Sequence, residues 1–477
     1  MVFSSITFLW LFMPVVLALY ALVPPRWRNA LLAAMSVVFY AWGAHSLVLL
    51  FLGSILFNYV AGAVIGHLKD EGRAPWARRV VWTAVVVDLL LLFTWKYAVF
   101  AVHQLNHALG AFGPDRLGVP SILLPIGISF YTFHAISYVV DVMRGQARPM
   151  RRVADYAQYM AFFPQLIAGP IIRYHQIADQ IRKPPPRSQR LDDLAEGFPR
   201  FALGLSKKVL IADQVGPVAD AAFGHASSLN TTGAWIAALA YTVQIYFDFS
   251  GYSDMAIGMG RMFGFRFPEN FNRPYSSVSM TDFWRRWHMT LSRWFRDYVY
   301  IPIGGSRGTQ GQTCRNLMFV FLLTGAWHGA AWTFVLWGVY NGGLLVGERL
   351  TGVRTLADDR APALRRAITF LIVVLGWVLF RASGLGDAGD VYSAMFSFDF
   401  GPLPAAVDQA LTPEPFLALG IGLASVLLPR DFVLGRVVQD RWAGAPLVAR
   451  AAVLAVLPIA AIAVAAGSFS PFLNFQF

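Results

Sequence analysis

The chain is predicted to be an all-α polytopic membrane protein. It has 477 residues, of which 56% are hydrophobic and only 14% are charged, whereas a soluble domain averages about 25% charged residues. The apolar residues form long blocks, and the loops between them are short and carry much of the Arg and Lys. This pattern is typical of helices that cross a lipid bilayer.

We expect one membrane domain over residues 1–477 with about eleven or twelve transmembrane or re-entrant helices. Within it, residues 1–145 would form N-terminal helices, residues 146–350 a central core and residues 351–477 C-terminal helices. No internal repeat is visible, so an inverted-repeat transporter is not favoured.

The basic loops predict the orientation in the membrane. The apolar block Ile6–Val23 is stopped by two prolines and followed by Arg26. Further basic loops lie at residues 69–79 and 144–152, in step with the alternation of the apolar blocks. Because Lys and Arg concentrate in cytoplasmic loops, we expect the N-terminus to lie outside the cytoplasm.

Charge and cysteine content exclude other classes of protein. The net charge is +12, but the basic residues lie in loops that set topology, so nucleic-acid binding is not expected. A single cysteine, Cys314, allows no internal disulfide and no cysteine metal cluster. We expect no bound metal.

Several blocks are interrupted in ways that predict special structure. Residues 156–172 are short and contain Pro and Gly, which predicts a re-entrant segment. Residues 316–349 are longer than one span of about 20 residues, which predicts two helices or one kinked at residues 325–329. Small residues at 250–260 predict close helix packing, and Asp88, inside an apolar block, predicts a buried ion pair with another helix.

His328 lies in the sequence GAWHGA within an apolar run. An ionisable residue at membrane depth is a functional-site hypothesis by default. In a dry, aromatic environment a histidine stays neutral and can act as a general base. A core histidine that is hydrogen-bonded to a neighbouring helix explains the residue equally well, and chemistry alone leaves both interpretations open.

His288 ends the polar segment that begins at Asp282. Helical spacing would place Trp284 and His288 on one face. Arg285 and Arg286 would suit a phosphate-bearing ligand, although an interfacial helix that binds lipid head groups also explains these arginines. The chain has no GxSxG elbow, Walker A motif or Cys/His nucleophile pair. The remaining class of reaction is the transfer of a chemical group to or from a hydroxyl, with histidine as the catalytic residue.

Two stretches of the chain resemble a known family. WRRWHMTLSRWFRDYVYIPIGGSR (284–307) and GAWHGAAWTFVLWGVYNG (325–342) are similar to the membrane-bound O-acyltransferases, in particular to the bacterial alginate O-acetylation branch. FDFSGYSDMAIG (247–258) and PENFNRPY (268–275) support this resemblance. The family implies a ring of membrane helices around a central tunnel, with His328 as the catalytic histidine and His288 as a supporting residue.

The resemblance also implies substrates and a partner. Acetyl-CoA would be the donor substrate, with no cofactor, and it would dock from the cytoplasm. The residues expected to bind the donor are Asn270, Asn272, Trp284, Arg285, Arg286, Trp287, Arg296 and Trp327. A separate periplasmic SGNH-type partner would place the acetyl group on an exopolysaccharide such as alginate, at the bacterial inner membrane.

The expected mechanism has two versions. Either His328 removes a proton from the accepting hydroxyl while His288 positions the thioester or polarises its carbonyl, or His328 is itself transiently acetylated. The alternative functions are acylation of a lipid, peptide or small molecule, and a non-catalytic polysaccharide export channel.

Overall fold

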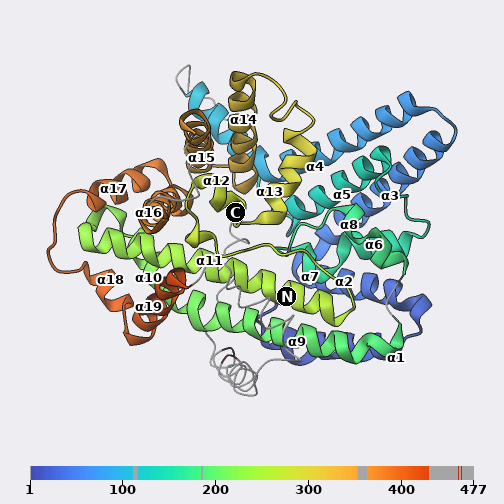
Figure 1. The fold of residues 1–477 in the computed structure, drawn as a ribbon, viewed down its shortest axis with the longest axis horizontal. Coiled ribbons are helices and arrows are strands. Elements are labelled where there is room, and N and C mark those ends of the chain that lie inside the picture. Colours follow the sequence, from blue (N-terminus) through green and yellow to red (C-terminus); the bar gives the residue numbers. More distant parts are fainter. Residues whose placement is uncertain are drawn as a thin grey trace. The chain divides into compact units, whose positions relative to one another are not determined.

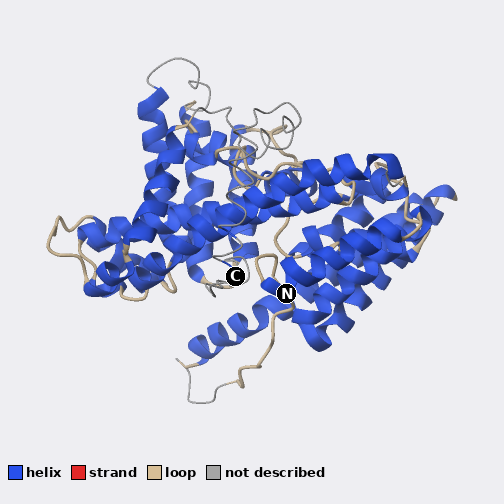
Figure 2. Ribbon diagram, turned by 90° about the horizontal axis from the view of Figure 1, so that it is seen from below, coloured by secondary structure: helices blue, strands red, loops and turns tan. Residues whose placement is uncertain are grey.

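The computed structural model describes residues 2–110, 117–183, 186–352, 362–428, 460 and 464. Every regular element in these residues is a helix (Figure 2), which confirms the predicted all-helical class. The chain divides into two compact units, residues 1–195 with 259–268 and residues 196–258 with 269–477. Each unit is considered by itself, and the predicted single membrane domain stays a prediction.

The first unit is built mostly from the N-terminal helices (Figure 1). They are α1 (Met13–Leu22), α2 (Arg28–Ala44), α3 (Val48–Asp70), α4 (Ala74–Leu109), α5 (Ile128–Arg144), α6 (Val153–Ala161), α7 (Phe163–Leu166) and α8 (Tyr174–Arg182). Helices α3, α4 and α5 pack against one another, and α6 packs against α2. Residues 167–173 are not helical, so the segment expected to be re-entrant is short and broken.

Three helices in the described part of the chain are long and apolar enough to cross a membrane: α3, α4 and α16 (Pro362–Arg381). On α3 and α4 large apolar side chains such as Leu49 and Leu90 are exposed, as expected for surfaces that contact lipid. Asp88 was predicted to have an ion partner on another helix, but the structure places a neutral amide beside it: Asn58 Nδ2 of α3 donates to Asp88 Oδ1 over 2.9 Å. The count of eleven or twelve membrane elements stays a prediction.

The second unit contains the polar segments of the sequence. Its helices are α10 (Asp213–Phe223), α12 (Met280–Trp284), α13 (Met289–Phe295), α14 (Gln310–His328), α15 (Trp332–Thr351), α16, α17 (Leu385–Met395), α18 (Ala405–Ala410) and α19 (Pro413–Leu427). Two longer helices, α9 (Arg190–Lys207) and α11 (Thr231–Met262), have residues in both units.

Glycines allow α9 and α11 to approach closely. A Cβ atom on Gly204 of α9 would lie 2.5 Å from the carbonyl oxygen of Gly251 on α11, and one on Gly251 would lie 2.8 Å from the oxygen of Gly204. Any larger residue would push the two backbones apart. The close packing predicted from the small residues at 250–260 is therefore confirmed.

The long apolar stretch at 316–349 is two helices, as one of the two expected arrangements predicted. α14 ends at His328, α15 begins at Trp332, and the two helices pack side by side (Figure 1). A Cβ on Gly325 would lie 2.3 Å from the oxygen of Phe334, so only glycine fits there. This hairpin places His328 at the last position of α14.

Candidate active site

His288 lies between two short helices and has a left-handed backbone. α12 ends at Trp284, and His288, with φ 41° and ψ 53°, precedes α13. The expectation that Trp284 and His288 share one face of a continuous helix is therefore wrong. An extended segment, residues 270–272, binds the backbone on both sides of His288 in place of helical hydrogen bonds. Asn272 N–H donates to Arg286 O and Met289 N–H donates to Asn270 O, both over 2.9 Å.

The side chain of Asn270 holds His288 in one tautomer. Asn270 Oδ1 accepts from the Thr290 N–H over 3.2 Å and from the Thr290 hydroxyl over 2.8 Å. A backbone N–H can only donate, so the atom that faces it must be the amide oxygen. His288 Nδ1 lies 3.1 Å from the same oxygen and must therefore carry the imidazole proton. This leaves Nε2 as a hydrogen-bond acceptor.

His288 is fully buried, with 1% of its surface exposed. Burial disfavours the charged form and lowers the pKa of His288 from 6.5 to about 3. The imidazole is therefore neutral at cellular pH, and Nε2 has no hydrogen-bond partner within the described residues. Since Nε2 accepts and does not donate, this geometry favours positioning a ligand N–H or O–H over polarising a thioester carbonyl.

His328 is half-buried and surrounded by aromatic rings. Its ring centroid lies 4.8 Å from that of Trp327, 4.9 Å from Phe380 and 5.1 Å from Trp337, all edge to face. These contacts come from α14, α15 and α16. Packing between three helices therefore fixes the position of the imidazole.

Trp327 connects the two histidines. Its ring centroid is 6.1 Å from that of His288 and 4.8 Å from that of His328. The structure therefore gathers these three residues, which the sequence had placed in one site. Their catalytic and donor-binding roles stay predictions.

The other residues predicted to bind the donor lie in different environments. Trp284 and Trp287 are buried in the aromatic core of the unit. Arg286 is paired with Asp282, 2.8 Å away, and Arg296 with Asp297, 2.7 Å away.

Asn270 is fully buried and positions His288, so its observed contacts are with protein groups. Asn272 contributes backbone contacts with Arg286. Arg285 is exposed. Arg285 and Arg296 are therefore both open to solvent, and the Arg296 side chain is 57% exposed.

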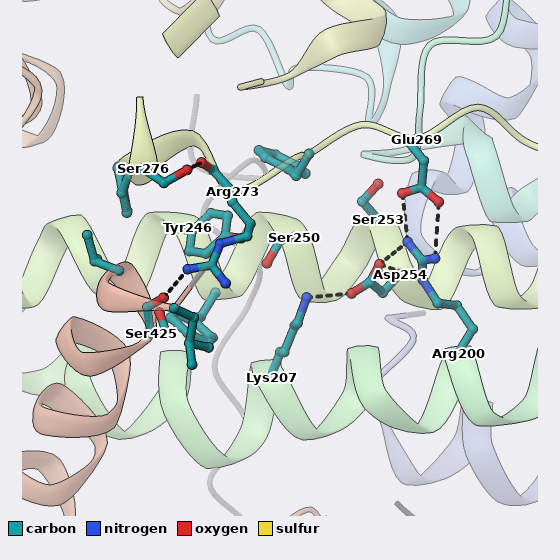
Figure 3. Close-up of a pocket in the computed structure, with 15 residues that line it drawn as sticks. Arg200, Lys207, Tyr246, Ser250, Ser253, Asp254, Glu269, Arg273, Ser276 and Ser425 are labelled. Atoms are coloured by element: carbon teal, nitrogen blue, oxygen red, sulfur yellow. Dashed lines mark hydrogen bonds and ion pairs between the residues drawn. The ribbon is translucent and has the colours of Figure 1, made fainter. Parts of the chain in front are cut away.

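A cavity whose lining includes charged and hydroxyl side chains was not predicted from the sequence. It has a volume of about 120 Å³ and is lined by residues of α9, α11, α19 and the segment after Pro268, including Lys207, Ser250, Ser253 and Arg273 (Figure 3). Close spacing of small residues at 250–260 was a signal for helix packing, but it also places two hydroxyls on one face of α11.

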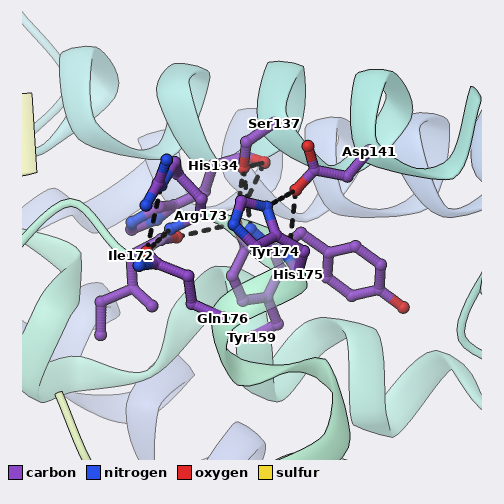
Figure 4. Close-up of polar contacts among 9 residues, drawn as sticks. All are labelled: His134, Ser137, Asp141, Tyr159, Ile172, Arg173, Tyr174, His175 and Gln176. Atoms are coloured by element: carbon purple, nitrogen blue, oxygen red, sulfur yellow. Dashed lines mark hydrogen bonds and ion pairs between the residues drawn. The ribbon is translucent and has the colours of Figure 1, made fainter. Parts of the chain in front are cut away.

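The first unit has a polar cluster of its own (Figure 4). Asp141 Oδ2 lies 2.8 Å from His175 Nδ1 and accepts from the His175 N–H over 3.0 Å. The Tyr159 hydroxyl donates to Ile172 O over 3.0 Å. The Asp141–His175 contacts tie α8 to α5, and the Tyr159 contact ties the non-helical residues 167–173 to α6, which gives the cluster a structural role.

Metal binding finds no support in this site. Across the residues that the structure describes, no group of three or more His, Cys, Asp or Glu side chains could hold an ion. The site consists of two imidazoles that lie beside aromatic rings.

Comparison with known families defines the class of protein. Residues 82–381 match the model of MBOAT, the membrane-bound O-acyltransferase family, and the chain belongs to this family. It is therefore an O-acyltransferase of the membrane, and the resemblance predicted from its motifs is confirmed.

Individual relatives are similar over most of their length. A probable alginate O-acetylase AlgI of Azotobacter vinelandii is 45% identical, with the whole of both chains covered. The protein of the same name from Pseudomonas aeruginosa is 51% identical over 83% of this chain and 75% of the relative. A peptidoglycan O-acetyltransferase of Helicobacter pylori is 36% identical over 83% and 80%.

Proposed function

We propose that the protein takes an acetyl group from cytoplasmic acetyl-CoA and passes it across the inner membrane for O-acetylation of an exopolysaccharide such as alginate. The observation that carries this proposal is the pair of histidines around Trp327, in which His288 has a fixed acceptor atom. The names of the relatives support acetyl as the group and a polysaccharide as the acceptor.

In the proposed reaction, an accepting hydroxyl attacks the carbonyl carbon of the thioester. The new C–O bond forms as the C–S bond breaks, and His328 takes the hydroxyl proton and returns it to the leaving thiolate. His288 Nε2 accepts a hydrogen bond from an N–H or O–H of a substrate and orients it. Transient acetylation of His328 is the covalent version of the same transfer.

The proposal includes a location and a partner. The alternation of basic loops supports an N-terminus on the periplasmic side. A separate SGNH-type protein in the periplasm would receive the acetyl group and transfer it to the polymer.

The test uses the full chain in nanodiscs with radiolabelled acetyl-CoA. Wild type should release or transfer the label, and His328→Ala should lose this activity at least 100-fold while it stays inserted and folded. His225→Ala, which changes an exposed histidine of the same unit, is the control and should keep full activity. A fully active His328→Ala variant would overturn both versions of the mechanism.

Acylation of a lipid, peptide or small molecule is the second candidate. It predicts labelled lipid or peptide when the same assay is run in native membranes. Label on polysaccharide that requires the periplasmic partner would exclude it.

A further inference from the structure

Ser250 and Ser253 place two buried hydroxyl groups at the cavity beside α11. Both side chains are 2% exposed, and neither hydroxyl has a hydrogen-bond partner within the described residues. A buried hydroxyl without a partner costs stability, on the order of 1–3 kcal/mol. Two such groups one helical turn apart, both lining one cavity, indicate that the cavity is built to hold a polar ligand.

The charged side chains around the cavity add up to a positive charge. Arg200 binds Asp254 and Glu269, and Lys207 Nζ lies 2.6 Å from Asp254 Oδ2. These two cations and two carboxylates balance. Arg273, which also lines the cavity, adds one more cation, so the lining has a net charge of +1.

Arginine and lysine side chains supply hydrogen-bond donors to the lining. Both carboxylates already accept from Arg200 or Lys207. The Arg273 guanidinium, which also lines the cavity, donates to Ser425 O over 2.5 Å. Figure 3 shows this guanidinium, the Lys207 ammonium and the Ser250 hydroxyl turned toward the same space. A ligand with several acceptor oxygens and a negative charge fits this lining.

The size of the cavity limits the ligand to a small group. An apolar cavity of about 150 Å³ in another protein holds benzene, so about 120 Å³ accommodates a group of roughly five heavy atoms. A phosphate has this size and carries close to two negative charges as a monoester. Arg is also the side chain best suited to phosphate.

The cavity shares one chain segment with the histidine site. Glu269, Phe271 and Arg273 line the cavity, whereas Asn270, between them, holds His288. This alternation is expected of an extended segment, whose successive side chains point to opposite sides. The ring centroid of Phe271 lies 6.5 Å from that of His288, so one aromatic ring separates the two sites.

We propose that this cavity binds one phosphate group of the acyl donor and so anchors the end of the donor that lies away from the thioester. The inference rests on the proposed function, because it takes the donor to be a coenzyme A thioester. The same lining would also bind a free phosphate ion. The test therefore distinguishes a phosphate group of the donor from a free ion.

The first experiment compares two donors on the full chain in nanodiscs: acetyl-CoA and acetyl-pantetheine, which has the thioester without phosphate. Wild type should have a KM for acetyl-CoA at least tenfold below that for acetyl-pantetheine. Arg273→Gln and the double variant Ser250→Ala, Ser253→Ala should each lose most of this difference, because their KM for acetyl-CoA rises toward that for acetyl-pantetheine. Arg307→Gln, which removes an exposed arginine of the same unit, should keep it.

The second experiment measures binding without turnover. Inorganic phosphate and coenzyme A should each raise the melting temperature of wild type. The double serine variant should melt at a higher temperature than wild type without ligand, because it removes two buried hydroxyls, and it should respond less to both ligands. A shift with phosphate alone would assign the cavity to a free ion and overturn the donor anchor.

The outcomes distinguish this inference from the proposed function. If the variants discriminate between the two donors as well as wild type does, the anchor is wrong and the donor stands. If wild type uses neither donor, the proposed donor is wrong. The binding experiment then shows whether the cavity binds phosphate. The proposed phosphate site is overturned if coenzyme A and phosphate shift the melting temperature equally in wild type and variants. It is also overturned if neither ligand shifts the melting temperature of any of these proteins.

Discussion

His288 and His328 are alike in the sequence but are held by different means. His288 is fully buried, has a left-handed backbone and is fixed by a hydrogen bond to Asn270. His328 is half-buried at the end of a helix and lies among aromatic rings. Hydrogen bonds determine which nitrogen of His288 accepts, whereas packing determines where His328 lies. Changes to the polar contacts and to the packing should therefore have separable effects.

Removal of the Asn270 side chain should have the largest effect. Asn270→Ala removes three hydrogen bonds to one buried oxygen, from His288 Nδ1, the Thr290 N–H and the Thr290 hydroxyl. We expect a loss of about 4 kcal/mol in stability, measured by thermal unfolding in detergent. Thr290→Val removes only one of the three bonds and should cost about 1 kcal/mol. Equal losses in the two variants would contradict the central role of the amide.

His288→Asn tests the Nε2 acceptor of His288 while it keeps the backbone conformation and the hydrogen bond to Asn270. Asn adopts the left-handed backbone readily, and its amide N–H can still donate to Asn270, so the variant should fold. It lacks an atom at Nε2, and turnover should fall roughly 100-fold, or about 2.7 kcal/mol in the barrier. His225→Asn should leave turnover unchanged. Full activity of His288→Asn would show that Nε2 has no part in transfer.

Gly325→Ala tests the packing that places His328. The added Cβ would meet the Phe334 carbonyl at 2.3 Å and push α15 away from α14. We expect a loss of about 2.5 kcal/mol, together with reduced activity. Gly343→Ala, on α15 with nothing within 4 Å, is the matched control and should be neutral or slightly stabilising. Similar melting temperatures for the two variants would contradict this account.

Acid should destabilise the site through His288. Its pKa is about 3 in the folded protein and 6.5 when unfolded, so between these values the unfolded state binds more protons. Stability therefore rises with pH in this window and falls by about 2 kcal/mol from pH 7 to pH 5. The acid-induced fall in melting temperature should be smaller in His288→Asn than in wild type. An identical pH dependence would mean that His288 is protonated in the folded state.

The sequence predicted features that depend on local composition. The glycines at 325–329 predicted either a break between two helices or a kink, and the break is what α14 and α15 show; the small residues at 250–260 predicted close packing of α11. The backbone of His288 could not be predicted, because it results from pairing with Asn270 and Asn272, which lie outside the local window. The cavity was missed for the same reason: Lys207, Ser250 and Arg273 meet only in the folded unit.

The hydrogen bond between Asn58 and Asp88 has a consequence for biogenesis. A carboxyl group in the middle of a single apolar helix costs roughly 3 kcal/mol to transfer from the translocon into lipid. Asn58 Nδ2 of α3 donates a hydrogen bond to Asp88 Oδ1 of α4 across adjacent helices. The two helices should therefore leave the insertion machinery together as a hairpin, with the polar pair formed before either helix is released into the bilayer.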